Sequence, residues 1–225
     1  MDACTLPVLP TIHNIKFHFK LGRRLDYFKC VKKHNLVSKC WGNYYTFRFA
    51  NRKKPAFSFF PSSNIINCTG VTGFGEVFKT VTNFNKKFGT EVKFSQLCVD
   101  NITASGEFKQ KKNKPASTAA SAVAVAASAA AEAKKKLGRN ILNLSAVRNI
   151  IEQSEKENIK PSLYPLHFPG LVLRFINKTP TCILFSSGKF TIVGAKTVRQ
   201  VYRTHFKICK ILRATAAAAA AATAL

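Results

Sequence analysis

The segment FPGLVLRFINKTPTCILFSSGKFTIVGAK, residues 168–196, decides the fold of this chain. It contains two apolar runs, each with a phenylalanine at one end, Phe168 in the first and Phe185 in the second. Ser-Ser-Gly (186–188) then joins the second run to a third, which ends at Val193. Short runs rich in β-branched and aromatic residues, separated by turn residues, predict strands joined in hairpins. A weaker copy of the same order lies between about residues 41 and 70.

The whole chain repeats one order of elements: a strand, a helix, a run of strands and a long helix. An internal duplication explains this order most economically. Asn14 and Asn101 open the two copies, each followed by isoleucine, and Arg48 and Arg174 match in a central strand. The predicted parts are an N-terminal arm (1–10), a first repeat (11–92), a second repeat (93–212) and an Ala-rich tail (213–225) that frays. An Ala/Lys-rich insert at about 109–140 interrupts the second repeat and is expected to form an exposed, partly helical or disordered loop.

The charge of the chain points to a polyanionic partner. Its 36 basic and 10 acidic residues give a formal net charge of +26. Nucleic acid is the leading partner for such a chain, and an anionic membrane surface is the alternative. No segment is long and apolar enough for a membrane span and no signal peptide opens the chain, so a soluble intracellular protein is expected.

The same sequence argues against an enzyme or a metalloprotein. The seven cysteines form no C-x-x-C pair, and their number is odd, which disfavours a zinc site or a secretory disulfide framework. Phosphate-binding loops, nucleophile elbows and clusters of histidine with carboxylates are lacking. We therefore predict no catalytic residues, no metal and no cofactor.

Three pairs of residues are candidates for contact with DNA. Phe168 and Phe185 lie at the turn ends of their strands, where they form either part of the core or a wedge that enters a base step. Asn14 and Asn101 interrupt apolar strands, either as structural amides or as donors to minor-groove acceptors. Arg48 and Arg174 either extend along a sheet edge or contact phosphates.

These motifs resemble the TATA-box-binding protein family. The resemblance rests on Phe-Pro-Gly-Leu (168–171), Arg174, Leu-Phe-Ser-Ser-Gly-Lys (184–189), Gly-Ala-Lys (194–196) and the two Asn-Ile pairs. It implies an α+β saddle, in which two pseudosymmetric repeats form a curved antiparallel sheet with helices on the convex face. It also implies a nuclear, non-enzymatic initiation factor that binds and bends double-stranded promoter DNA as a monomer. Its expected partners are IIA-like and IIB-like general transcription factors and the RNA polymerase machinery.

The resemblance also assigns roles to single residues. The wedge residues would be Phe168 and Phe185, with Trp41 and either Phe59 or Phe60 at the other end. The following residues would line the minor groove: Asn14, Asn101, Thr69, Thr103, Ile183, Val193 and Pro169. Phosphates would be bound by Arg48, Arg174, Lys189 and Lys196.

The first repeat departs from the family pattern. Lys16 and Asn67 replace apolar residues that face the groove, and the hairpin after Phe60 reads Pro-Ser-Ser. These changes leave a second function open, a saddle used mainly as a protein-interaction platform with weak or lost TATA specificity. A repair or nucleic-acid-processing enzyme on a similar saddle is a third alternative.

Overall fold

The computed structural model describes residues 9–34, 36–49, 55–108, 142–154, 158–176 and 180–223. Its ten strands form one antiparallel sheet in the order β2-β3-β4-β5-β1-β6-β10-β9-β8-β7. The order is symmetrical about the central pair β1 and β6, so each half of the sheet comes from one half of the chain. This confirms the predicted α+β fold.

The two halves of the chain contain the same elements in the same order. The first half consists of β1 (Thr11–Lys20), α1 (Tyr27–His34), β2 (Val37–Cys40), β3 (Tyr45–Arg48), β4 (Ala56–Phe60), β5 (Ile65–Val71) and α2 (Phe74–Phe88), followed by the 3-10 turn η1 (Phe94–Gln96). The second half consists of β6 (Cys98–Glu107), α4 (Leu144–Ser154), β7 (Ile159–Tyr164), β8 (Phe168–Phe175), β9 (Thr181–Phe185), β10 (Lys189–Ala195) and α5 (Val198–Thr223).

The structure describes most of the Ala-rich C-terminal tail but not the Ala/Lys-rich insert. Helix α5 extends to Thr223, beyond the predicted end of the final helix at about Leu212. The reason is that alanine has the highest helix propensity and simply continues the helix. The predicted insert at 109–140 lies outside the described residues.

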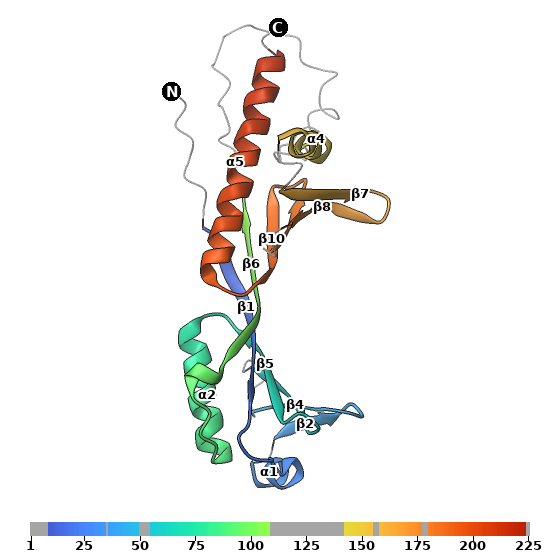
Figure 1. Ribbon diagram of the computed structural model, residues 1–225. Helices are drawn as coiled ribbons and strands as arrows, with labels where there is room; N and C mark the ends of the chain where they lie inside the picture. Colours follow the sequence, from blue (N-terminus) through green and yellow to red (C-terminus); the bar gives the residue numbers. More distant parts are fainter. Residues whose placement is uncertain are drawn as a thin grey trace, which may run out of the picture.

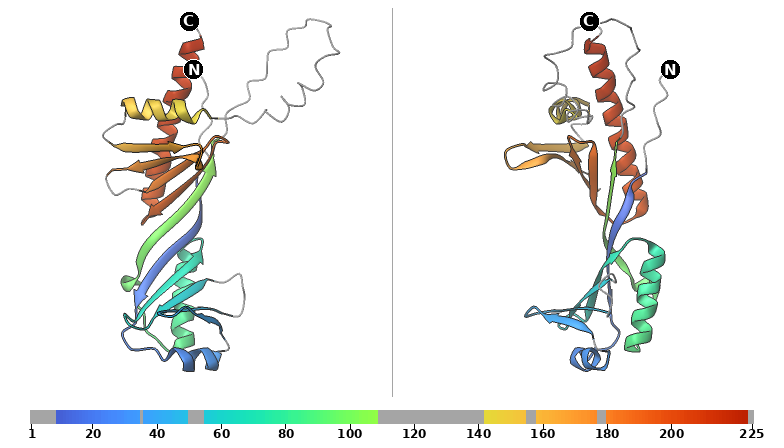
Figure 2. Two further views of the ribbon diagram at one scale, coloured as in Figure 1. Left: turned by 90° about the vertical axis from the view of Figure 1, so that its right-hand side faces the viewer. Right: turned by 180° about the vertical axis from the view of Figure 1, so that it is seen from behind.

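The sheet is curved, and its long helices α2 and α5 lie on one side of it. Figure 1 shows α2 and α5 on one side, while the strands near β7–β8 and β2–β4 project to the other side at the two ends. Figure 2 shows β1 and β6 side by side between the two halves. The side away from α2 and α5 is therefore concave, as in the predicted saddle.

Strict alternation along the strands builds the core on the helix side. In β1, Ile15, Phe17 and Phe19 are fully buried, whereas the residues between them are partly exposed. Helix α2 presents apolar residues at helical spacing to this layer, and the Phe19 and Phe84 rings pack edge to face at 5.1 Å. Among the described helices, none is long and apolar enough to cross a membrane.

Candidate nucleic-acid interface

The concave face is built from the partly exposed residues of the alternating strands. We define it by the side chains that point away from α2 and α5 in β1, β4, β5, β6, β9 and β10: Asn14, Lys16, His18, Ser58, Phe60, Asn67, Thr69, Asn101, Thr103, Ser105, Ile183, Phe185, Thr191 and Val193. All the predicted groove residues except Pro169 lie in this set. The surface combines amides and hydroxyls in its middle with aromatic rings towards its ends.

Asn14 and Asn101 occupy equivalent places in the middle of this face. The backbone N–H of Gly70 donates to Asn14 Oδ1 at 2.7 Å, and the backbone N–H of Gly194 donates to Asn101 Oδ1 at 2.6 Å. Both glycines have a left-handed φ, +91° and +86°, at points where the strand register shifts. The side-chain carbonyls therefore fix the bulges. The Asn14 NH₂ group remains a donor on the concave face, and the Asn101 NH₂ group donates one hydrogen to Thr103 Oγ1 at 3.4 Å and keeps the other.

The aromatic pair of the second repeat lies at the end of the sheet. The ring centroids of Phe168 and Phe185 are 6.0 Å apart, and Phe168 is 38% exposed. Gly170 is the Cα partner of Phe185, and a Cβ there would lie 2.7 Å from Phe168 Cε1 and 3.2 Å from Phe185 Cε1. The absence of a side chain at Gly170 is what allows the two rings to meet.

The opposite end of the sheet has a different aromatic pair. Phe59 is only 1% exposed and belongs to the core, so it was wrong as a wedge candidate. Phe60 faces the concave side, because β4 and β9 share one burial pattern in which Phe60 corresponds to Phe185. The Tyr44 ring stacks on Phe60 at 5.1 Å, a contact that the sequence interpretation missed.

Trp41 lies beside this pair in the turn between β2 and β3. Its side chain is 55% exposed, and its indole N–H donates to Thr46 Oγ1 at 3.0 Å. This hydrogen bond fixes the ring over the hairpin. Trp41 is thus an exposed aromatic residue at the end of the sheet, whereas the ring that contacts Phe60 is Tyr44.

Basic residues border the concave face at matching positions. Arg48 and Arg174 are both exposed, and their Cα partners, Ala56 and Thr181, begin the next strand. Lys189 and Lys196 are exposed at the start of β10 and just after its end. All four basic side chains are placed where they could contact the phosphate backbone of a DNA duplex that runs along the saddle.

Two cross-strand pairs in the middle of the sheet were also missed. His18 Nδ1 lies 2.8 Å from Asp100 Oδ1, and His13 Nε2 lies 2.6 Å from Ser105 Oγ. Neither pair forms a sequence motif, since each joins residues that are far apart in the chain. Only the pairing of β1 with β6 brings them together.

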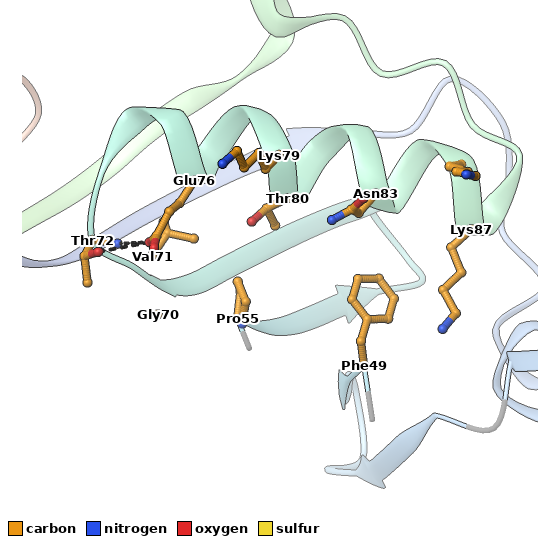
Figure 3. A pocket seen from close by; sticks show the side chains of 11 residues that line it. Phe49, Pro55, Gly70, Val71, Thr72, Glu76, Lys79, Thr80, Asn83 and Lys87 are labelled. Carbon is orange, nitrogen blue, oxygen red and sulfur yellow. Dashed lines mark hydrogen bonds between the residues drawn. The ribbon is translucent and has the colours of Figure 1, made fainter. Parts of the chain in front are cut away.

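Two cavities lined by described residues lie in different places. One of about 440 Å³ borders the second-repeat wedge, with Phe185, Pro169 and Thr191 in its wall. The other, of about 830 Å³, lies against helix α2 and contains Lys79, Lys86 and Lys87 (Figure 3). In the described segments, no group of three or more histidine, cysteine, aspartate or glutamate side chains could hold a metal ion.

Comparison with known proteins finds similarity to one family. A family model described as "Transcription factor TFIID (or TATA-binding protein, TBP)" matches residues 142–215. The TATA-box-binding protein 2 of Methanosarcina mazei is 28% identical over 148 residues, which cover 64% of this chain and 61% of that protein. The family model covers about one third of the chain, and the chain is thus similar, at low identity, to the TATA-box-binding proteins.

Further matches show how far the similarity to the TATA-box-binding proteins extends. The TATA-box-binding protein of Thermococcus kodakarensis is 33% identical over 72 residues, 32% of this chain and 34% of that protein. The matched part of this chain thus spans about one third of the first relative's length and less than two thirds of the second's. The solved structure of Methanococcus jannaschii TBP has the same fold, with a TM-score of 0.62 at 20% identity over 92% of this chain and 99% of that one. All of these matches are described as TATA-binding proteins or as the transcription factor TFIID, and none of these descriptions names an enzyme.

Proposed function

We propose that this protein binds double-stranded promoter DNA through the minor groove, bends it and nucleates the preinitiation complex. The observation that carries the proposal is the pair of asparagine amides at the centre of the concave face. Each carbonyl accepts from a glycine N–H, which fixes the amide, so each NH₂ group offers the ligand a donor, although one hydrogen of the Asn101 NH₂ is shared with Thr103 Oγ1. The minor groove of an A·T or T·A pair presents only acceptors, N3 of adenine and O2 of thymine. Two symmetrical donors therefore suit a binding site with A·T-rich central base pairs, whether each pair is A·T or T·A.

The aromatic pairs at the two ends supply the bending. Apolar side chains inserted between base steps are how minor-groove binders, this family included, kink the duplex. Phe168 and Phe185 form the wedge at one end, while Phe60 forms it at the other with Tyr44 and Trp41 beside it. Between the wedges, Thr69, Thr103, Ile183 and Val193 would lie against the groove floor and walls, with Pro169 next to the second wedge.

Electrostatic attraction supplies affinity without sequence preference. Arg48, Arg174, Lys189 and Lys196 would neutralise phosphates on both sides of the groove. With a net charge of +26, non-specific binding is expected to be strong and to weaken steeply with salt. Specificity therefore has to come from the concave face and from the deformability of the DNA.

The organisation and partners of the protein follow the same model. It would act as a monomer on DNA, with repeats at 11–92 and 93–212. IIA-like and IIB-like factors and the polymerase machinery would assemble on it. The segment 164–167 is exposed and has no acidic residue, so an IIB-like factor that contacts it would meet no carboxylate there. A nuclear location remains a prediction, because the relatives named above come from archaea.

The test compares binding and bending with and without the wedge. Affinity for a TATA-like and a random duplex is measured at two salt concentrations, and bending is measured by energy transfer between the DNA ends. The combined substitution Phe168→Ala and Phe185→Ala should abolish bending and leave non-specific binding largely intact. Phe78→Ala with Phe94→Ala is the matched control, because these two exposed rings pack edge to face at 4.7 Å outside the concave face. Unchanged bending by the wedge variant would contradict the assignment.

A protein-interaction platform is the second candidate. The lysine-lined cavity at α2 and the charged Lys16 on the concave face favour it. Such a protein would bind the TATA-like and random duplexes equally, with a steep loss of affinity in salt. The same binding measurements therefore separate the two functions.

A further inference from the structure

An acidic side chain lies at the seam between β1 and β6. Asp100 contacts His18 at 2.8 Å, and the two side chains are 31% and 32% exposed. His18 belongs to the concave face, because its neighbours Phe17 and Phe19 are fully buried on the helix side. The β1–β6 register shifts beside Asp100, which lies at this irregularity with its carboxylate against His18. A carboxylate is thus fixed on the surface that would cover DNA.

The equivalent position in the other half carries no acid. Counting from the matched asparagines, Asp100 corresponds to His13 and Ser105 corresponds to His18. The second contact, between His13 and Ser105 at 2.6 Å, is therefore the counterpart of the His18–Asp100 pair. The fold makes the two contacts alike, but only one of them presents a carboxylate.

The concave face near the His18–Asp100 contact is also more polar in its other residues than the matching part near the His13–Ser105 contact. Lys16 lies on the concave face where the second repeat has Thr103, and His18 pairs across β1 and β5 with Asn67, where the second repeat pairs Ser105 with Thr191. The two halves of the concave face therefore offer different hydrogen-bonding groups to the groove.

A carboxylate suits only one kind of base pair in the minor groove. An ionised carboxylate only accepts hydrogen bonds, and A·T pairs also present only acceptors there. The guanine 2-amino group is the one donor on the groove floor. Facing A·T, Asp100 would lose water without gaining a partner, whereas facing guanine it would gain a charge-assisted hydrogen bond.

We infer that Asp100, oriented by His18, recognises the 2-amino group of one guanine in the half-site beneath the first repeat. The inference rests on the proposed minor-groove function and adds a G·C pair to an otherwise A·T-rich site. A purely structural role of the His18–Asp100 contact would leave base preference unchanged.

Inosine isolates the relevant atom, because an I·C pair lacks the 2-amino group of G·C. Starting from a TATA-like duplex, each A·T pair is replaced in turn by G·C or by I·C, and affinities are compared by competition. The proteins are the native chain, Asp100→Asn and, as a control, Glu107→Gln. Glu107 is an exposed carboxylate at the far end of the same strand, opposite Lys189.

The native protein should bind G·C about tenfold more tightly than I·C at one position in one half-site, the usual scale for a specific base contact. Asp100→Asn should bring this ratio to about one or below, because its amide can donate to the acceptors of I·C. Glu107→Gln should keep the native ratio. A ratio of one at every position, or a ratio that survives Asp100→Asn, overturns the inference. If the native protein does not prefer or bend the parent duplex at all, the minor-groove function itself is wrong.

Discussion

Gly170 controls the geometry of the second-repeat wedge, so Gly170→Ala tests the wedge without removing either ring. A Cβ at this position would lie 2.7 Å from Phe168 Cε1, 3.0 Å from Ile183 Cγ2 and 3.2 Å from Phe185 Cε1. All three neighbours are side chains on the concave face or at its end. The added methyl group therefore pushes directly on the surface that would enter the base step.

The size of the effect follows from these distances. Ordinary carbon contacts begin near 3.4 Å, so the Phe168 ring must move by several tenths of an ångström. Overpacking in a closed core costs about 1–3 kcal/mol, but Phe168 is 38% exposed and can swing outward. We expect a stability loss of at most about 1 kcal/mol, a fall of about 2–4 °C in Tm for a chain of this size. The displaced ring should lower affinity for a TATA-like duplex by about tenfold and reduce the bend, because insertion requires both rings together.

The assay combines energy transfer between the DNA ends with thermal unfolding of the free protein. Gly22→Ala is the matched control, since a Cβ at Gly22 would meet nothing within 4 Å. The reasoning would be refuted if Gly170→Ala bent DNA like the native protein, or if its loss of affinity were equal for TATA-like and random duplexes.

Three further predictions concern other parts of the molecule. Asn14→Asp or Asn101→Asp keeps an oxygen that accepts from the glycine N–H but removes the NH₂ donor. Affinity for an A·T duplex should therefore fall at least about tenfold, with little change in Tm. Unchanged affinity in titrations would show that the amides do not contact bases. Burial lowers the pKa of His205, so the unfolded chain binds a proton on this imidazole at a higher pH than the folded protein does. The free energy of unfolding therefore falls as the pH drops below about 6.5. His205→Phe should reduce the difference between the urea midpoints at pH 7.5 and pH 5.5. Cys98 is exposed and is the Cα partner of His18, so bound DNA should slow its alkylation, as quantified by peptide mass spectrometry. Equal alkylation with and without DNA would mean that the ligand lies elsewhere.

The sequence predicted the second repeat well because its turns are unambiguous. Ser-Ser-Gly-Lys (186–189) fixes one hairpin, and Phe168 lies two residues before a glycine whose missing side chain is required by geometry. In the first repeat the corresponding hairpin reads Pro-Ser-Ser-Asn, and two adjacent phenylalanines, Phe59 and Phe60, precede it at the end of the strand. Residue type cannot distinguish Phe59 from Phe60. Only the register of β4 against β5 shows which one faces the helices, because a one-residue slip exchanges the two faces.

The contacts His18–Asp100 and His13–Ser105 between β1 and β6 could not be predicted from the sequence for a different reason. Local patterns report which residues of one strand share a face, but the contact between His18 and Asp100 depends on how β1 pairs with β6 and on a shift in that register. The duplication made Asn14 and Asn101 recognisable as a pair because both halves kept the amide. It concealed Asp100, whose counterpart by position is His13.

This difference between the halves has a consequence for orientation. A symmetrical saddle with equal wedges would bind a pseudosymmetric A·T site in either direction, because the groove acceptors of A·T and T·A are nearly the same. Here one end presents Phe168 with Phe185, whereas the other presents Tyr44 with Phe60. If Asp100 also prefers guanine on one side only, a single G·C pair placed off-centre would select one direction by about tenfold. Moving that pair to the other half-site should then reverse the protein on the DNA, which site-directed cleavage from Cys98 can detect as a switch of the cleaved half. Cleavage that stays equal in both halves for both duplexes would show that the chemical difference between the repeats does not direct binding.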